Sequence, residues 1–142
     1  MEKRMAAVLG TLVLGAGAAL AAQGPAQAAS YPTCNALKSV SVTDRLFTYQ
    51  PYYTGTGSRN CEMSRGAQSD GVHALQNAIR ACYRTIASDG IYGPKTEEAV
   101  KSVQRTEKVG VDGVYGPQTR KAMGWPLYQG GVGFVRCAAP GV

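Results

Sequence analysis

The stretch DGIYGPKT, residues 89–96, returns almost unchanged as DGVYGPQT, residues 112–119, and this duplication decides the fold. In each copy the Asp-Gly pair begins a tight turn, because Asp accepts hydrogen bonds from nearby backbone amides and Gly tolerates positive φ. The second Gly permits another sharp bend, and the Pro after it disfavours helix at the preceding residue. A repeat of this kind indicates one supersecondary unit used twice.

Eight residues of the two copies are expected to be structural, as turn formers and helix N-caps. Thr96 and Thr119 stand where an N-cap belongs, and the acidic residues after Thr96 favour the start of a helix. The whole set is Asp89, Gly90, Gly93, Thr96, Asp112, Gly113, Gly116 and Thr119.

Apolar residues at helical spacing predict a helix before and after the first copy. One stripe covers residues 72–82 and another covers residues 99–103. After the second copy, residues 119–123 leave room for about one turn before Pro126 ends any helix. The predicted order is therefore helix, turn, helix, turn, short helix.

These blocks resemble the peptidoglycan-binding domain of type 1. The resemblance rests on VHALQ at residues 72–76, on residues 89–104, and on the second turn. Val103 stands where the family usually has an aromatic, and residues 82–88 lack the usual Gly-Tyr end of the first helix. The resemblance implies a mainly α, three-helix fold that holds bacterial cell-wall peptidoglycan without cutting it.

Within this resemblance, Tyr92 and Tyr115 occupy equivalent places and are the first candidates for ligand contact. The alternative is that both rings fill the core beneath their turns. Gln104, Arg105 and Arg120 are further ligand-binding candidates, because their side chains can donate hydrogen bonds to carboxylate or acetamido oxygens.

The N-terminus has the pattern of a secretory signal peptide. Lys3 and Arg4 precede an uncharged run, and residues 26–28, Ala-Gln-Ala, fit a cleavage site. An uncleaved membrane anchor is the alternative, since the run could nearly span a bilayer. We expect cleavage after Ala28 and a secreted protein associated with the cell wall.

The regions before and after the repeat differ from it in their residue patterns. Val40 and Val42 alternate with polar residues and predict a β-hairpin. Tyr52 and Tyr53 could stack on sugar rings, although packing on the core is the commoner role. The predicted divisions are a signal peptide (1–28), an N-terminal extension (29–63), a peptidoglycan-binding-like domain (64–124) and a C-terminal tail wrapped on that domain (125–142).

Four cysteines in an exported chain of this size imply two disulfides. Three pairings are possible, and we prefer Cys34–Cys61, which closes the extension on itself, with Cys82–Cys137, which ties the tail to the first helix. We expect no metal and no cofactor, because no Cys-x-x-Cys pair occurs and the chain has one His.

Little in the sequence indicates catalysis. His73 is the single His, all cysteines are explained by disulfides, and Glu97 and Glu98 are explained by a helix start. For an exported protein with a net charge of +6, wall polymers and acidic lipids are more available anions than nucleic acid. The charges are scattered, so we favour ordinary solubility as their role, with a minor part in steering. We expect a monomeric, non-catalytic peptidoglycan binder without stable membrane association. A cell-wall hydrolase or its accessory subunit, and an exported interaction or inhibitor module, are the alternatives.

Overall fold

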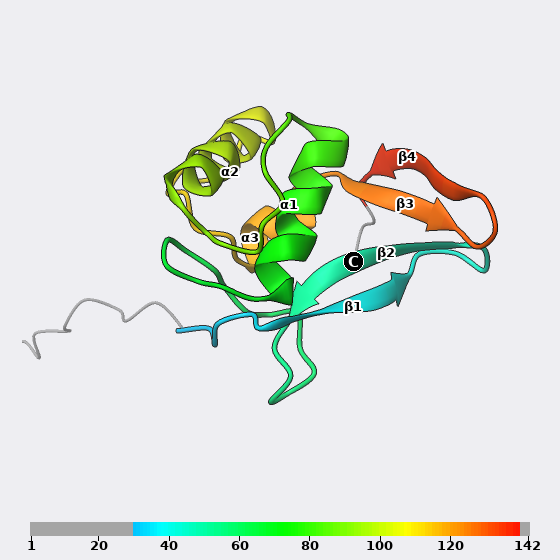
Figure 1. Cartoon of the computed structure of the whole chain (residues 1–142), viewed down its shortest axis with the longest axis horizontal. Helices are drawn as coiled ribbons and strands as arrows, with labels where there is room; N and C mark the ends of the chain where they lie inside the picture. The colour runs from blue at the N-terminus through cyan, green and yellow to red at the C-terminus, as the bar shows by residue number, and fades with distance from the viewer. Residues whose placement is uncertain (1–29, 140–142) are drawn as a thin grey trace, which may run out of the picture.

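The computed structural model describes residues 30–139, which fold into one antiparallel sheet and three helices (Figure 1). The predicted signal peptide lies outside the described residues. The elements in order are β1 (Ala36–Ser41), β2 (Leu46–Tyr52), α1 (Asp70–Cys82), α2 (Pro94–Thr106), α3 (Pro117–Ala122), β3 (Trp125–Gln129) and β4 (Gly133–Ala138).

The mainly α prediction is wrong, because both regions outside the repeat form β-hairpins. The two hairpins join through β2 and β3 into a four-stranded sheet with the order β1-β2-β3-β4. The C-terminal tail becomes β3 and β4, with positive φ at Gly131 in their turn and at Gly133, the first residue of β4. A local reading of the tail missed this sheet, because its strands are completed by pairing with distant β2.

The hairpin predicted near residue 40 is present as β1 and β2, with Val40 opposite Thr48. Its turn is closed by Thr43, whose Oγ1 accepts hydrogen bonds from the backbone N–H groups of Arg45 at 3.3 Å and Leu46 at 3.1 Å. This local side-chain contact stabilises the reversal between the two strands.

The core lies between α1, α2, the two repeated turns and the start of β3. α1 begins at its N-cap Ser69, whose side chain accepts a hydrogen bond from the N–H of Val72, and it contacts α2 and the first three strands. The predicted stripes on α1 and α2 are buried. The largest buried rings are those of Tyr92, Tyr115 and Trp125. Within residues 30–139, no helix is long and apolar enough to cross a membrane.

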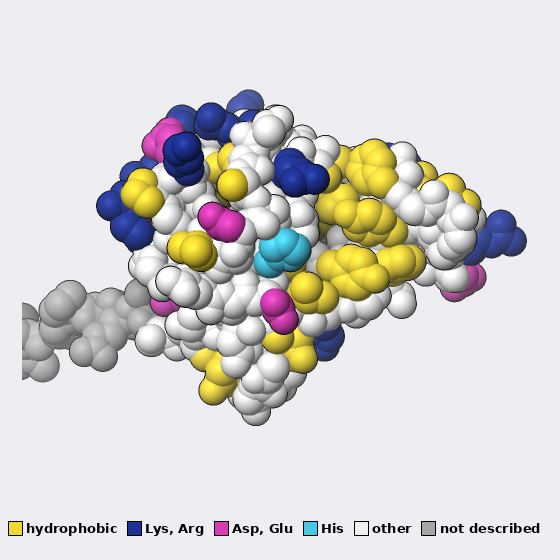
Figure 2. All heavy atoms as spheres, in the orientation of Figure 1, with side chains coloured by type: hydrophobic (Ala, Val, Ile, Leu, Met, Phe, Trp, Pro, Cys, Tyr) yellow, Lys and Arg dark blue, Asp and Glu magenta, His cyan; other side chains and the backbone are white. Residues whose placement is uncertain are grey.

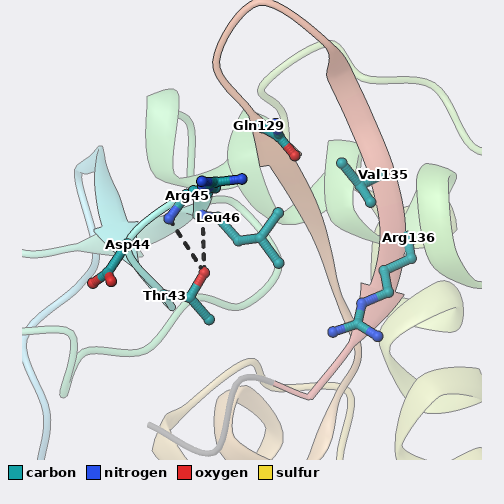
Figure 3. Close-up of a pocket in the computed structure, with 7 residues that line it drawn as sticks. All are labelled: Thr43, Asp44, Arg45, Leu46, Gln129, Val135 and Arg136. Atoms are coloured by element: carbon teal, nitrogen blue, oxygen red, sulfur yellow. Dashed lines mark hydrogen bonds between the residues drawn. The ribbon is translucent and has the colours of Figure 1, made fainter.

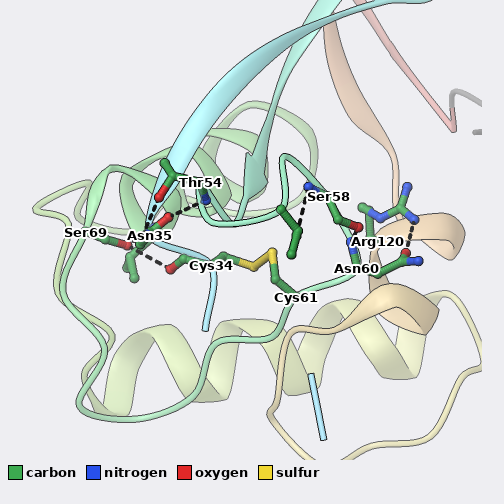
Figure 4. Close-up of a disulfide and its surroundings, with 10 residues drawn as sticks. Cys34, Asn35, Thr54, Ser58, Asn60, Cys61, Ser69 and Arg120 are labelled. Atoms are coloured by element: carbon green, nitrogen blue, oxygen red, sulfur yellow. Dashed lines mark hydrogen bonds between the residues drawn. A yellow bond between two sulfur atoms is a disulfide. The ribbon is translucent and has the colours of Figure 1, made fainter. Parts of the chain in front are cut away.

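Both preferred disulfide pairings are formed. Cys34–Cys61 joins the two ends of the first hairpin region, and Figure 4 shows the Ser69 hydroxyl donating to the carbonyl oxygen of Cys34. Cys82–Cys137 links the end of α1 to β4. The second bridge therefore ties the β3–β4 hairpin covalently to α1, whereas the first closes the N-terminal hairpin region on itself.

Candidate functional site

A buried glutamine organises the first repeated turn. Gln76 on α1 donates from Nε2 to Asp89 Oδ1 at 3.0 Å, to the carbonyl oxygen of Ile91 at 2.9 Å and to Thr96 Oγ1 at 3.0 Å. Its Oε1 accepts the N–H of Gly90 at 2.8 Å. One carboxamide thus connects helix α1, the turn and the first residues of α2.

The second turn repeats this arrangement around Gln104 of α2. Nε2 donates to Asp112 Oδ1 at 2.8 Å, to the carbonyl oxygen of Val114 at 3.0 Å and to Thr119 Oγ1 at 3.1 Å. Oε1 accepts the N–H groups of Asp112 and Gly113 at 3.0 and 2.9 Å. The duplicated unit therefore includes the glutamine of the preceding helix, and Gln104 acts in the scaffold rather than at an exposed ligand site.

The helix N-caps differ from the prediction. Gly93 and Gly116 are the N-caps of α2 and α3, and a proline follows each of them at the first helical position. Proline suits that position because its fixed φ is already helical. Thr96 and Thr119 lie inside the first turn of each helix, where their hydroxyls accept from the buried glutamines. The Asp-Gly turns are as predicted, with Gly90 at φ 75° and Gly113 at φ 74°.

The rings of Tyr92 and Tyr115 lie in the core. Tyr92 donates from its hydroxyl to the carbonyl oxygen of Gly113 at 2.7 Å, so the first copy is bonded directly to the second. The ring of Tyr115 meets Trp125 edge-on, with centroids 6.3 Å apart. Both side chains are fully buried, and burial raises the pKa of each phenol. Neither ring is accessible to a ligand at the surface, which favours the alternative that both rings pack in the core.

The two predicted arginines lie in different environments. Arg105 is exposed on α2 and forms a salt bridge from Nη2 to Glu98 Oε1 at 2.8 Å. Arg120 is buried on α3, where its Nη2 donates to Asn60 Oδ1 at 3.2 Å and its carbonyl oxygen accepts from Trp125 Nε1 at 3.0 Å. Burial lowers the pKa of the Arg120 guanidinium. Of the five ligand candidates, Arg105 is thus the one with an exposed side chain.

Two clefts flank the first turn and share Asp89 and Ile91. One cleft, of about 320 Å³, is also bordered by Pro94 and Lys95 at the start of α2. The other, of about 460 Å³, is also bordered by His73 and by other residues at the start of α1. The turn therefore forms a ridge that carries the carboxylate of Asp89 and the exposed side chain of Ile91, beside the amine of Lys95.

The electrostatics of this ridge follow from its turn. The N–H of Ile91 and then the amide of Gln76 lower the pKa of Asp89 below its ordinary value. Asp89 is therefore ionised at neutral pH and can accept hydrogen bonds from amide or ammonium groups, while Lys95 can donate to carboxylates. This combination suits a polar chain that carries both donors and acceptors. Ile91 and Lys95 were not predicted as site residues, although both belong to the repeated motif.

A third cleft, of about 520 Å³, lies between the β1–β2 turn and strand β4 (Figure 3). Arg45, next to the β1–β2 turn, and Arg136 on β4 border it, and Asp44 partly offsets their charge. The cleft therefore carries only a small excess of positive charge. In the part of the chain that is described, no three His, Cys, Asp or Glu residues are grouped so that they could hold a metal ion.

A known family model matches the region that contains both turns. Residues 68–123 match the family model described as Putative peptidoglycan binding domain. No curated protein matches the chain.

Three solved structures are similar to parts of the chain. The SleB N-terminal domain is 31% identical, with a TM-score of 0.41, over 43% of this chain and 85% of that one. A fused Zn-dependent amidase/peptidase/peptidoglycan-binding domain protein from Clostridium acetobutylicum is 28% identical, with a TM-score of 0.40, over 41% of this chain and 26% of that one. A peptidoglycan-binding protein from Clostridioides difficile, in complex with glutamine hydroxamate, is 22% identical, with a TM-score of 0.45, over 58% and 53%.

Proposed function

Because residues 68–123 are a domain of the peptidoglycan-binding type 1 family, we propose that this chain is an exported, non-catalytic protein that attaches to bacterial cell-wall peptidoglycan. The observation that carries the proposal is the coincidence of the family match with the duplicated glutamine-centred turns. Those turns fix the helices and leave the ridge around Asp89 exposed between its two clefts.

Export is supported by the disulfides. Such bonds persist in oxidising compartments and are rare in the cytosol. Both bridges link segments that are distant in the sequence, Cys34 with Cys61 and Cys82 with Cys137. This observation agrees with the signal peptide predicted from residues 1–28.

A binding role is supported by the structural contacts of the groups that could do chemistry. The four cysteines are oxidised in pairs, so none is a free thiolate. Glu97 binds Arg65 at 2.8 Å and Lys101 at 2.9 Å. Asp89 and Asp112 each accept hydrogen bonds within their own turn. These groups already have stabilising partners, which is the arrangement expected of a scaffold. A carboxylate has about four acceptor sites, so Asp89 can hold its turn and still accept a hydrogen bond from a ligand.

In this proposal the contact surface is the ridge of the first turn. Ile91 supplies an apolar contact, and the carboxylate of Asp89 with the amine of Lys95 supplies polar ones. Arg105, also exposed, would be a secondary contact for carboxylates of the stem peptide.

Sedimentation with insoluble peptidoglycan, stripped of secondary polymers, tests the proposal. The oxidised protein should pellet at both low and high salt, because simple charge attraction would be screened while a fitted contact would persist. Protein that stays in the supernatant at every ionic strength would contradict peptidoglycan binding. Dye release from labelled wall should remain at background, and clear turnover would refute the non-catalytic role.

A matched pair of variants tests the ridge. Ile91 and Val111 are similarly exposed, at 46% and 49%. Ile91→Ala should weaken retention on the wall several-fold, whereas Val111→Ala should leave it unchanged. Equal retention of both variants would place the contact surface elsewhere.

A further inference from the structure

Four aromatic rings form a continuous row on one face of the sheet. Phe47 and Tyr49 are two residues apart on β2 and therefore share a face of the sheet. Tyr128 of β3 is paired with Phe47, and Phe134 of β4 is paired with Tyr128. Successive centroids are 5.5 Å apart for Tyr49–Phe47, 6.0 Å for Phe47–Tyr128 and 6.3 Å for Tyr128–Phe134. Figure 2 shows apolar side chains gathered over this part of the sheet beside α1.

The row is open to solvent. Tyr49 is 43% exposed and Phe134 is 53% exposed. A contiguous apolar patch on a soluble protein usually marks a contact surface, because exposed aromatic area is costly to hydrate. The rings therefore require an explanation beyond packing of the sheet.

The row leads into a cleft of about 400 Å³ between the sheet and α1. Tyr49 and Tyr128 border the cleft from the sheet, and His73 and Asn77 border it from α1. Its other lining residues are Leu37, Ala74, Ala78 and Pro126. The cleft thus has aromatic and aliphatic walls with a few polar tips, which is the usual composition of a small-molecule site.

The polar groups of this cleft carry no fixed charge. None of its eight lining residues is Lys, Arg, Asp or Glu. Burial raises the pKa of Tyr128, so its hydroxyl stays neutral and can both donate and accept. Asn77 is held in place, since its Oδ1 accepts the Ser88 hydroxyl at 2.8 Å. A charged ligand would lose hydration here without gaining a counter-charge.

We propose that this aromatic cleft binds uncharged, N-acetylated sugar rings of the wall glycan, an inference that rests on the proposed attachment to peptidoglycan. A pyranose ring presents a face of C–H bonds that can stack on tyrosine, and its hydroxyl and acetamido edge can bond to Tyr, Asn and His side chains. The uncharged lining favours sugar over the charged stem peptide. The adjoining rings of Phe47 on β2 and Phe134 on β4 extend the platform across the sheet for a second sugar.

This glycan site is distinct from the ridge at the first turn but adjoins one of its clefts, because His73 borders both. Its aromatic wall comes from Tyr49 on β2 and Tyr128 on β3, both outside the residues 68–123 that match the family. Its second wall is α1, which lies inside that match and is capped at Ser69 near the ridge cleft. The two surfaces could therefore engage the glycan and the peptide of one polymer.

Titration of the oxidised full chain with the soluble hexamer of N-acetylglucosamine tests the inference. Backbone NMR shifts should move at His73 and Asn77 and along β2 and β3. Tyr49→Ala should weaken affinity roughly 3- to 10-fold, which corresponds to the loss of one aromatic stacking contact. Tyr49→Phe keeps the ring and should stay within about 3-fold on the same scale. Tyr31→Ala, at a 37% exposed ring outside the row, should bind as the wild type does.

The outcomes separate this inference from the proposed function. Retention on insoluble peptidoglycan without any response to the hexamer would refute the glycan site and leave wall binding in place. Absence of both responses would refute both. Equal affinity of Tyr49→Ala and wild type would also refute the site. If the same resonances moved on concentrating the protein alone, with no sugar effect, the row would be a contact between two copies.

Discussion

Replacement of Gln76 by Ala should remove the central support of the first turn. The carboxamide is buried and makes the four hydrogen bonds described above, including the bond that satisfies the N–H of Gly90. A hydrogen bond contributes about 0.5–1.5 kcal/mol net, and a buried donor left without a partner costs about 1–3 kcal/mol. Other partners remain for the carbonyl oxygen of Ile91, so we expect Gln76→Ala to lower the free energy of unfolding by about 3 kcal/mol.

Denaturant unfolding of the oxidised protein, followed by the fluorescence of Trp125, measures this loss. Trp125 is the only tryptophan and is fully buried, so its emission reports on the core. Gln118→Ala, at an exposed glutamine of α3, is the control and should change stability by less than about 0.5 kcal/mol. Because the two copies share one bonding pattern, Gln104→Ala should lose a similar amount to Gln76→Ala.

The reasoning would be refuted if Gln76→Ala and Gln118→Ala unfolded at the same denaturant concentration with the same slope. Such a result would mean that water or the turn itself replaces the carboxamide without loss. A change in the slope alone would indicate altered compactness rather than the loss of specific bonds.

Three further perturbations have expected outcomes. Replacing Cys82 and Cys137 together by Ser should lower the free energy of unfolding by about 4 kcal/mol, because that bridge spans a sequence separation of 55 residues. Denaturant unfolding measures this loss, and a value below about 1 kcal/mol would contradict the prediction. Tyr92→Phe should lower the free energy of unfolding by about 1–2 kcal/mol, since it leaves the carbonyl oxygen of Gly113 without its hydrogen bond. Tyr115→Phe should lower it little, because the Tyr115 hydroxyl has no hydrogen-bond partner among the described residues. Equal losses for the two variants would refute this distinction. Asp89 has a folded-state pKa below its ordinary value of 3.8, so its stabilising effect is present above about pH 4 and is lost as pH falls through the lower folded value. Unfolding of Asp89→Asn, measured from pH 6 to pH 2, should accordingly depend less on pH than unfolding of the wild type, and an identical dependence would rule out this role.

Local patterns were sufficient for the helical half of the molecule. The turns at Gly90 and Gly113 and the apolar stripes of α1 and α2 each depend on neighbouring residues, so their signals lie within short windows of sequence. The first hairpin was predicted on the same grounds, from alternation and a short turn.

The candidate sites were harder to predict, because burial is a property of the assembled core. Tyr92 and Tyr115 are ligand candidates by position and core residues by structure. Gln104 could equally serve a ligand or a turn until Asp112 and Thr119 are brought to its amide. Residue type and spacing alone cannot distinguish these roles.

By itself, the sequence determined the duplicated turns and the helices that they separate, since these depend on contacts between near neighbours. It also determined the match of residues 68–123 to the family model, because that match follows residue types at fixed spacing. Only the tertiary structure decided that the segments before and after the repeat form one sheet, with Phe47 of β2 opposite Tyr128 of β3. Strand pairing between distant segments depends on which edges and apolar faces meet in the folded chain. The aromatic row exists only after that pairing, so no single stretch of sequence could reveal it.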